Sequence, residues 1–254
     1  MEQREYEIMY VAEESHWWYQ GMAAIARKVI ETYYAPGPHL RILDAGCGTG
    51  SGLLFLSRYG KVTGLDISPH ALRLSRKRNQ RDLLRASLMS LPFLGESFDL
   101  VTSFDTLYFK EVDDALALQE FVRVLIPGGR IVLRVPAFDW LRGIHDAKVA
   151  TGHRYTLREL SRKMAEKGLE VQFINYVNSF LFPFVLLKRL SEKHLPPQED
   201  SDIAIPLGYL GQVFKGILIL ESCLIRKCRF PFGLSIIAVG RKSSESTKES
   251  LKGL

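Results

Sequence analysis

A glycine-rich turn and an acidic residue downstream of it form the first group that could bind a ligand. Residues 41–50 read Arg-Ile-Leu-Asp-Ala-Gly-Cys-Gly-Thr-Gly, a short apolar run that ends in a Gly-x-Gly-x-Gly turn. Glycines allow a tight turn and a close approach of the backbone to a ligand, and the helix expected over 51–59 would begin with free N–H groups. Asp66 ends the next predicted strand, 61–66, and lies 20 residues after Gly46. A carboxylate at this spacing can accept both hydroxyls of a ribose, so we expect a nucleotide-like ligand here rather than a plain structural turn.

A second group of reactive side chains follows the fifth predicted strand, 131–136. His145 and His153 lie in this stretch, which should rim the ligand site because it follows the carboxyl end of a parallel strand. Either histidine could act as a general base, with Asp146 orienting it, or both could belong to a structural hydrogen-bond network. Tyr108, just after the fourth predicted strand, either faces a substrate or packs in the core.

Four blocks of the sequence resemble the class I S-adenosylmethionine-dependent methyltransferases. The first is similar to motif I of that family, the next two to its passage from the third to the fourth strand, and the last to its turn into strand five. In order along the chain, these blocks are 43–50, 91–93, 97–101 and 123–130. A His-Trp-Trp-Tyr block at 16–19 and a His-Arg-Tyr-Thr block at 153–156 resemble a subgroup of the same family.

The resemblance implies S-adenosyl-L-methionine as the cofactor, with S-adenosyl-L-homocysteine as its product. It implies methyl transfer to an O, N or C nucleophile of a small, partly apolar acceptor. The alternatives are a regulatory or non-catalytic protein that binds the cofactor, and an enzyme that uses the same fold for other chemistry such as a cyclisation. Methylation of nucleic acid is disfavoured, because the chain has no Asn-Pro-Pro-Tyr-like block and no basic stripe interleaved with aromatic residues.

The resemblance also implies which residues contact the cofactor. Ser87 stands where the family usually carries an acid, so the adenine contact there would be a hydroxyl bond or the backbone of Leu88. Trp17, Trp18 and Tyr19 either fold over the cofactor, with a cation–π contact of about 0.5–2 kcal/mol, or pack on the domain. The implied cofactor residues are Asp44, Gly46, Cys47, Gly48, Gly50, Asp66, Ile67, Ser87, Leu88, Phe104, Asp105, Trp17 and Tyr19.

Alternating predicted strands and helices place the chain in the α/β class. With the resemblance, they predict a Rossmann-like, seven-stranded, mostly parallel sheet with helices on both faces. We expect an N-terminal helical arm or cap at 1–38, a cofactor-binding core at 39–176, a helical lid insert between strands six and seven at 177–232, the closing strand at 233–241 and a disordered tail at 242–254. The insert would serve as a hydrophobic substrate lid, a dimer surface or a membrane-surface foot.

Two local expectations concern elements beside the site. An amphipathic helix over 22–33 should cap the edge of the sheet, and the third strand should run over 83–88. A cluster of basic residues between Arg73 and Arg81, which includes Arg78, is expected to lie on a solvated helix face.

The composition is that of an ordinary globular protein, with 46% hydrophobic and 24% charged residues among 254. A net charge of +6 is too small to indicate a nucleic-acid-binding tail. Cys223 and Cys228 are poorly spaced for a metal pair, so no metal site is expected. The N-terminus lacks a signal-peptide pattern, and no uncharged apolar run is long enough to span a membrane. We therefore expect a cytoplasmic protein with reduced cysteines, monomeric or homodimeric, for which peripheral membrane contact stays open.

Overall fold

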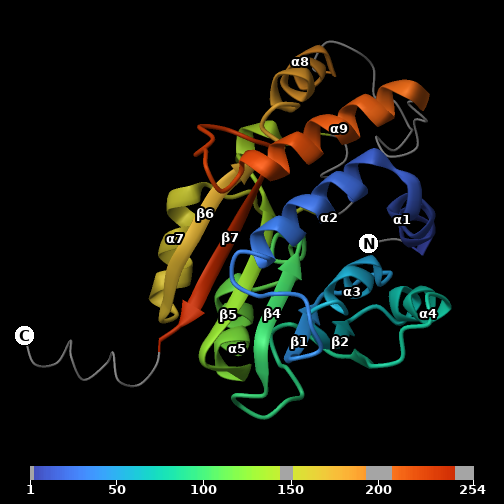
Figure 1. Ribbon diagram of the computed structural model, residues 1–254. Coiled ribbons are helices and arrows are strands. Elements are labelled where there is room, and N and C mark those ends of the chain that lie inside the picture. Colours follow the sequence, from blue (N-terminus) through green and yellow to red (C-terminus); the bar gives the residue numbers. More distant parts are fainter. Residues whose placement is uncertain (1–2, 144–150, 193–207, 244–254) are drawn as a thin grey trace, which may run out of the picture.

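The computed structural model describes residues 3–143, 151–192 and 208–243 and is built on a single sheet (Figure 1). In this part of the chain, seven strands lie in the order β3-β2-β1-β4-β5-β7-β6. Strands β1 to β5 pair in parallel, and β7 runs antiparallel between β5 and β6. The strands are β1 Leu40–Ala45, β2 Gly60–Asp66, β3 Leu83–Arg85, β4 Phe98–Phe104, β5 Leu125–Pro136, β6 Leu169–Val177 and β7 Ser235–Lys242. This arrangement confirms the predicted Rossmann-like, mostly parallel sheet.

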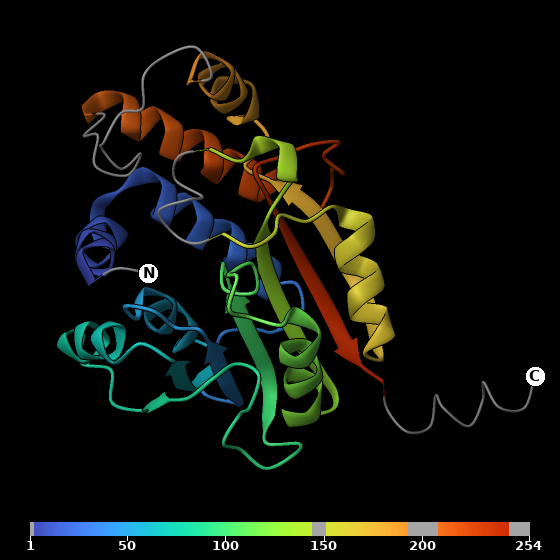
Figure 2. The same ribbon diagram turned by 180° about the vertical axis from the view of Figure 1, so that it is seen from behind.

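Helices cover both faces of the sheet (Figures 1 and 2). Helices α5 and α7 lie on one face, whereas α2 and α9 lie on the other, and α3 and α4 flank β2. None of the helices in the described ranges is long and apolar enough to cross a lipid bilayer. The helices are α1 Gln3–Ser15, α2 Trp17–Ile30, α3 Ser51–Leu56, α4 Pro69–Lys77, α5 Asp114–Val124, α7 Leu157–Glu166, α8 Phe182–Glu192 and α9 Gly208–Leu224.

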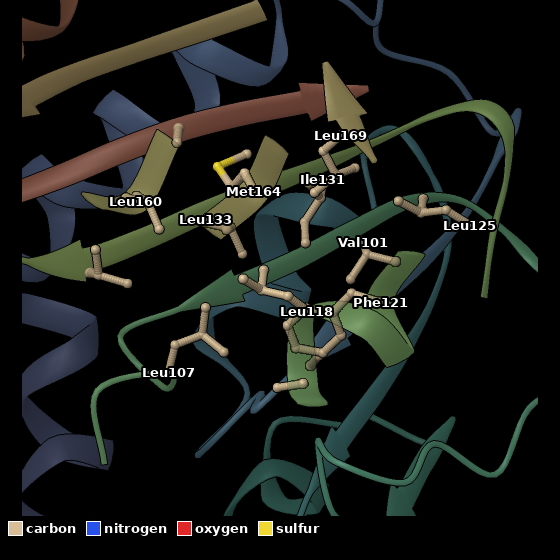
Figure 3. Packing of buried hydrophobic residues seen from close by; sticks show 14 of the residues in the cluster. Val101, Leu107, Leu118, Phe121, Leu125, Ile131, Leu133, Leu160, Met164 and Leu169 are labelled. Carbon is tan, nitrogen blue, oxygen red and sulfur yellow. The ribbon is translucent and has the colours of Figure 1, made fainter. Parts of the chain in front are cut away.

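The face that carries α5 and α7 holds the larger hydrophobic core (Figure 3). Phe121 of α5 and Met164 of α7 are completely buried, as are Val101 of β4 and Leu133 of β5. Each such side chain contributes about 1.5–3 kcal/mol to folding through the apolar surface it removes from water. This core holds β4 and β5 in place, and their carboxyl ends form part of the site described below.

The helix expected at the edge of the sheet covers its middle instead. Ile25 and Val29 of α2 belong to a buried cluster that includes Ile42 of β1, Leu100 of β4 and Val132 of β5. The prediction of an edge position was therefore wrong, because helical spacing identifies the apolar side of a helix but not the strands that this side covers.

Helix α9 packs alongside α2 on the same face (Figure 1). At Gly21 of α2 an added Cβ would lie 2.4 Å from Leu218 Cδ1, so the two helices pack closely because that position has no side chain. Helices α8 and α9 both lie between β6 and β7 in the chain, as the predicted insert requires. The predicted tail lies outside the described residues apart from residues 242 and 243.

Glu221 joins α9 to the segment after β6. Its carboxylate is completely buried and accepts the backbone N–H groups of Asn178, Ser179 and Phe180, the last two at 2.8 and 3.2 Å. Burial raises the pKa of Glu221, while the three N–H donors act in the opposite direction. One side chain thus meets three backbone donors at the start of the insert.

The bounds of two predicted strands differ from the structure. The third strand ends at Arg85 rather than at 88, because Ser87 pairs with Ser90 in an isolated antiparallel bridge. The fifth strand begins at Leu125 rather than at 131, because Leu125 is already extended and pairs with Phe98. Pairing between strands therefore determines where the third strand ends and where the fifth strand begins.

Replacement of Glu221 should destabilise the fold. Glu221→Ala leaves three backbone N–H groups, two of them buried, without their acceptor and should lower the free energy of unfolding by about 3 kcal/mol, measured by urea denaturation. Glu221→Gln keeps one acceptor oxygen and should cost less. The control is Glu166→Ala, which removes an exposed ion pair with Arg162 and should cost less than about 1 kcal/mol. Equal losses for Glu221→Ala and Glu166→Ala would contradict this role of Glu221.

Candidate active site

A pocket of about 330 Å³ opens at the carboxyl ends of β1 and β4. The strand order reverses between these two strands, because β2 and β3 lie on one side of β1 and β4 lies on the other. Open α/β sheets bind ligands at such switch points. The pocket wall is formed by α1, α2, the glycine turn after β1, the end of β2, the segment 104–109, and residues of β5, α8 and the start of β7.

The glycine turn forms the floor of the pocket, where Gly46, Cys47 and Gly48 line it. Gly46 and Gly48 have left-handed φ values of +84° and +54°. A Cβ on Gly46 would lie 2.2 Å from Thr106 Cγ2, so a side chain does not fit there. The N–H groups of Gly46 and Cys47 both donate to the carbonyl of Leu65, at 2.7 and 2.9 Å, and fix the turn to β2.

Cys47 and Gly50 also have structural roles in this turn. The Cys47 side chain is buried against Leu53 and Leu72, and burial raises the pKa of its thiol well above the usual value. Gly50, with φ +89°, begins α3, and a Cβ there would lie 2.3 Å from Ser75 Oγ. Gly50 is not among the residues that line the pocket. Its predicted role as a cofactor contact is therefore not supported by its position, which explains instead how the helix starts.

Asp66 connects the turn to the next helix. Its Oδ2 accepts the N–H of Gly48 at 2.9 Å and its Oδ1 accepts the N–H of Ser68 at 2.8 Å. Ser68 is the N-cap of α4. Burial raises the pKa of Asp66, and the backbone N–H groups around it lower it in part. The carboxylate lines the pocket at the end of β2, where the sequence places it.

Asp44 lies at the base of the pocket and is almost completely buried. The Thr102 hydroxyl donates to its Oδ1 at 2.7 Å. Burial, with a smaller contribution from the negative charges of Asp66 and Glu13, raises the pKa of Asp44 to about 7, although the Thr102 hydrogen bond acts to lower it. At neutral pH this carboxyl group is therefore close to its own titration.

The N-terminal arm lies over the glycine turn and supplies pocket residues that the sequence did not indicate. Tyr6, Met9 and Glu13 of α1 line the pocket. The Glu13 carboxylate accepts the Thr49 hydroxyl and forms an ion pair of 3.1 Å with Arg78. The side chains of Arg78 and Glu13 are only 4% and 7% exposed, so the prediction that Arg78 is solvated was wrong.

An ion pair of Arg134 and Asp105 lines the opposite side of the pocket. Both Nε and Nη2 of Arg134 contact the same oxygen, Asp105 Oδ2, at 2.8 and 2.6 Å. The guanidinium lies 5.6 Å from the ring centre of Trp18 and 5.2 Å from that of Phe104. Two aromatic contacts and one ion pair thus fix its position. Asp105 and Phe104 were predicted from the sequence, but Arg134 was not, because the pairing of β4 with β5 that brings it here is a tertiary contact.

The three aromatic residues at the start of α2, Trp17, Trp18 and Tyr19, do not all face the pocket. Trp18 and Tyr19 line the pocket, whereas Trp17 packs against Phe214 of α9, with ring centres 5.2 Å apart. Burial raises the pKa of Tyr19 strongly. Trp17 is therefore corrected from a cofactor contact to a packing residue, and Tyr19 is in position for a ligand.

Three predicted adenine and ribose contacts do not line the pocket. The Ile67 side chain is 64% exposed. Ser87 bends back to pair with Ser90, and Leu88 packs against the core on the α5 side of the sheet. The structure therefore gives no support to the side chains of Ile67, Ser87 and Leu88 as ligand contacts.

The three predicted catalytic residues have different positions. His153 has one ring nitrogen 3.1 Å from Asp139 and the other 2.8 Å from Glu159, and it does not line the pocket. This geometry fits the structural network that the sequence left open, not the general base. Tyr108 lines the pocket, and its carbonyl accepts the N–H of Gly152 at 2.7 Å. His145 lies outside the described residues.

The raised pKa of Asp44 predicts how stability depends on pH. Because the folded-state pKa of about 7 lies above the ordinary value of 3.8, the folded state holds this proton more tightly. The stabilisation is complete below about pH 4 and is lost as the pH rises through about 7. The free energy of unfolding of the wild type minus that of Asp44→Asn should therefore fall from about pH 4 to about pH 8, measured by urea denaturation.

Asp99→Asn is the matched control for this experiment. Burial acts to raise the pKa of Asp99, but hydrogen bonds and the charge of Arg41 outweigh it and lower the pKa. The free energy of unfolding of the wild type minus that of Asp99→Asn should therefore decrease as the pH falls, which is the opposite of the change expected for Asp44→Asn. Curves of the same slope for Asp44→Asn and the wild type would show that Asp44 titrates normally.

In a comparison with known protein families, residues 43–133 match the model of a family described as a methyltransferase domain. Phthiotriol/phenolphthiotriol dimycocerosates methyltransferase of Mycobacterium leprae is 38% identical over 98 residues, which are 36% of each chain. Malonyl-[acyl-carrier protein] O-methyltransferase of Erwinia pyrifoliae is 31% identical over 174 residues, 63% of this chain and 65% of that protein. The chain thus spans between 36% and 65% of the length of these two relatives.

A solved methyltransferase of Thermotoga maritima, described as a possible histamine N-methyltransferase, is similar over nearly the whole chain. It has a TM-score of 0.58 and 20% sequence identity, and the match covers 94% of this chain and 96% of that one. Together with the strand order, this similarity shows that the chain has the Rossmann-like methyltransferase fold, with the matched methyltransferase domain at residues 43–133.

Proposed function

We propose that this chain transfers a methyl group from S-adenosylmethionine to an O, N or C nucleophile of a small, partly apolar acceptor. The observation that carries the proposal is the meeting of Asp66 and the glycine turn in one pocket at the switch point of the sheet. The names of the partial relatives, which include methyltransferases for phthiotriol dimycocerosates and for demethylmenaquinone, support the reaction type.

Asp66 suits the ribose end of the cofactor. An ionised carboxylate has about four acceptor positions, and the N–H groups of Gly48 and Ser68 occupy two of them. The carboxylate therefore keeps acceptor capacity for hydroxyl donors while the backbone holds it in place. Gly46 and Gly48, which lack side chains, let a ligand approach the turn closely.

Arg134 and Asp105 suit the methionine end, which carries an ammonium and a carboxylate group. Arg134 uses Nε and Nη2 for one oxygen of Asp105, so Nη1 and the other oxygen, Oδ1, make no hydrogen bond to any residue in the described ranges. The pair thus offers one cationic donor and one anionic acceptor side by side in the pocket. We propose that Arg134 binds the carboxylate of the cofactor and that Asp105 binds its ammonium group.

S-adenosylmethionine supplies a methyl group that is already activated on a sulfonium, so the chain's main task is positioning. The acceptor would occupy the part of the pocket lined by Tyr108, Leu141, Val185 and Leu234. Three of these four side chains are aliphatic, which favours a partly apolar acceptor. Trp18 and Tyr19 of α2 add aromatic surface to the pocket wall, with Trp18 next to Arg134.

Calorimetric titration with S-adenosylmethionine and with S-adenosylhomocysteine tests the cofactor. Both should bind the wild type, and Asp66→Ala should weaken both at least about 100-fold, because it removes the acceptor for the ribose hydroxyls. The control is Asp82→Ala, whose exposed carboxylate pairs with Lys61 away from the pocket. Micromolar affinity retained by Asp66→Ala would contradict the ribose assignment, and absence of binding to the wild type would remove the proposed function.

A second titration tests Arg134 with S-adenosylmethionine and its decarboxylated form. Arg134→Met should weaken binding of S-adenosylmethionine about 30-fold, because a charge-assisted hydrogen bond to the carboxylate is lost. Binding of the decarboxylated form, which has no such carboxylate, should change less than about threefold.

Arg130→Met is the matched control for Arg134. Arg130 also lies on β5 and stacks on Tyr33, 4.8 Å from its ring centre, but it does not line the pocket. This variant should bind both compounds as the wild type does. Equal losses for the two compounds in Arg134→Met would show that Arg134 only supports the fold of the pocket.

A further inference from the structure

Asp44, Asp66 and Glu13 all line the pocket but differ in the groups that hold their carboxylates. Asp66 accepts a backbone N–H on each of its two oxygens, at 2.9 and 2.8 Å. Glu13 forms an ion pair of 3.1 Å with the guanidinium of Arg78. Asp44 has one neutral donor, the Thr102 hydroxyl. Because a buried carboxylate needs donors or a cation, Asp44 is the one of the three whose ionisation depends most on what enters the pocket.

The second oxygen of Asp44 lies at the pocket wall beside Gly52 of α3. The Asp44 side chain is only 3% exposed, and its Oδ2 makes no hydrogen bond to any residue in the ranges that the structure describes. Space remains beside Oδ2 because Gly52 has no side chain: a Cβ there would lie 2.8 Å from this oxygen, and Gly52 also lines the pocket. A buried carboxylate with an unused acceptor position next to a cavity is stabilised by a positive charge in that cavity.

The charged and titratable groups around Asp44 come from neighbouring strands, the glycine turn and the N-terminal arm. They are Asp66 of β2, Glu13 of α1, the ion pair of Arg134 on β5 with Asp105 after β4, and the thiol of Cys47. Helix α3, which lies beside Oδ2, has no charged residue. The negative charges of Asp66 and Glu13 oppose ionisation of Asp44, whereas Arg134, whose charge Asp105 balances, favours it. Together with burial they hold the pKa of Asp44 at about 7, so a new positive charge nearby would change its protonation at neutral pH.

S-adenosylmethionine and S-adenosylhomocysteine differ by one methyl group and by the positive charge of the sulfonium. We propose that Asp44 is the residue by which the pocket distinguishes the charged cofactor from its neutral product. This inference rests on the proposed function, because it requires that both compounds occupy the pocket.

The protonation of Asp44 follows from the charge of the bound compound. A nearby opposite charge lowers the pKa of a carboxyl group by about 1–3, so Asp44 is ionised when S-adenosylmethionine is bound and its proton passes to solvent. S-adenosylhomocysteine carries no charge on its sulfur and leaves the proton on Asp44. The affinity for S-adenosylmethionine therefore rises with pH relative to that for S-adenosylhomocysteine, since at higher pH less work is needed to remove the proton.

Calorimetric titration of the full chain tests this proposal without an acceptor. Titrations at pH 7 in buffers of different ionisation enthalpy count the protons released on binding. The excess released by S-adenosylmethionine over S-adenosylhomocysteine should be about half a proton larger in the wild type than in Asp44→Asn, because both proteins share any titration of the ligands. From pH 6 to pH 7, the ratio of the two affinities should rise about fivefold more in the wild type than in Asp44→Asn, because the ionised fraction of Asp44 rises by that factor. Thr102→Val keeps Asp44 but removes its hydroxyl donor, so it should move this rise to higher pH.

Asp82→Asn is the matched control, because the exposed carboxylate of Asp82 pairs with Lys61 away from the pocket. This variant should follow the wild type at each pH. The same pH dependence of the affinity ratio in the wild type, Asp44→Asn and Thr102→Val would overturn the inference, as would a dependence that Glu13→Gln removes and Asp44→Asn keeps. In those cases both compounds still bind and the proposed function stands, whereas binding of neither compound to the wild type would remove the proposed function and this inference with it.

Discussion

The carboxylate of Asp66 joins the glycine turn, which forms the floor of the pocket, to the turn at the start of α4. One oxygen accepts the N–H of Gly48 in the turn after β1, and the other accepts the N–H of Ser68 at the start of α4. Parallel pairing of β1 and β2 brings these turns together, because it places the carboxyl ends of both strands at the same edge of the sheet. The rest of the pocket is built around this fixed point: Gly46 approaches Thr106 on one side, and Asp44 lies beneath.

This floor concentrates negative charge. Asp44, Asp66 and Glu13 all line the pocket, and burial raises the pKa of each of them. Isolated buried carboxylates are costly, so each one needs donors nearby. The donors are the Thr102 hydroxyl for Asp44, backbone N–H groups for Asp66, and Thr49 with Arg78 for Glu13. A ligand with a positive centre would reduce the remaining repulsion, and the proposed cofactor carries one on its sulfonium.

The parts of the site that the sequence predicted are those fixed by local geometry. The spacing of Gly46, Gly48 and Asp66 follows from a strand, a turn, a helix and a second strand, so the printed sequence was sufficient to place them in one site. Arg134, Met9 and Glu13 were not predicted, because they reach the pocket only through the pairing of β5 with β4 and the packing of α1 over the turn.

His153 was a candidate general base because of its residue type. Its two ring nitrogens contact Asp139 and Glu159, and residue type alone does not reveal such partners. The family resemblance predicted the sheet correctly, yet Ser87 and Leu88 are not among the residues that line the pocket.

The insert between β6 and β7 belongs to the pocket wall as much as to the surface. Helix α9 packs on α2 through Leu218 at Gly21 and through Phe214 at Trp17, and α2 carries the pocket residues Trp18 and Tyr19. Glu221 of the same helix is fixed by three backbone N–H groups at the start of the insert. Close-packed helices transmit displacement to one another. The inner side of α9 therefore supports the aromatic wall of the pocket through its contacts with α2.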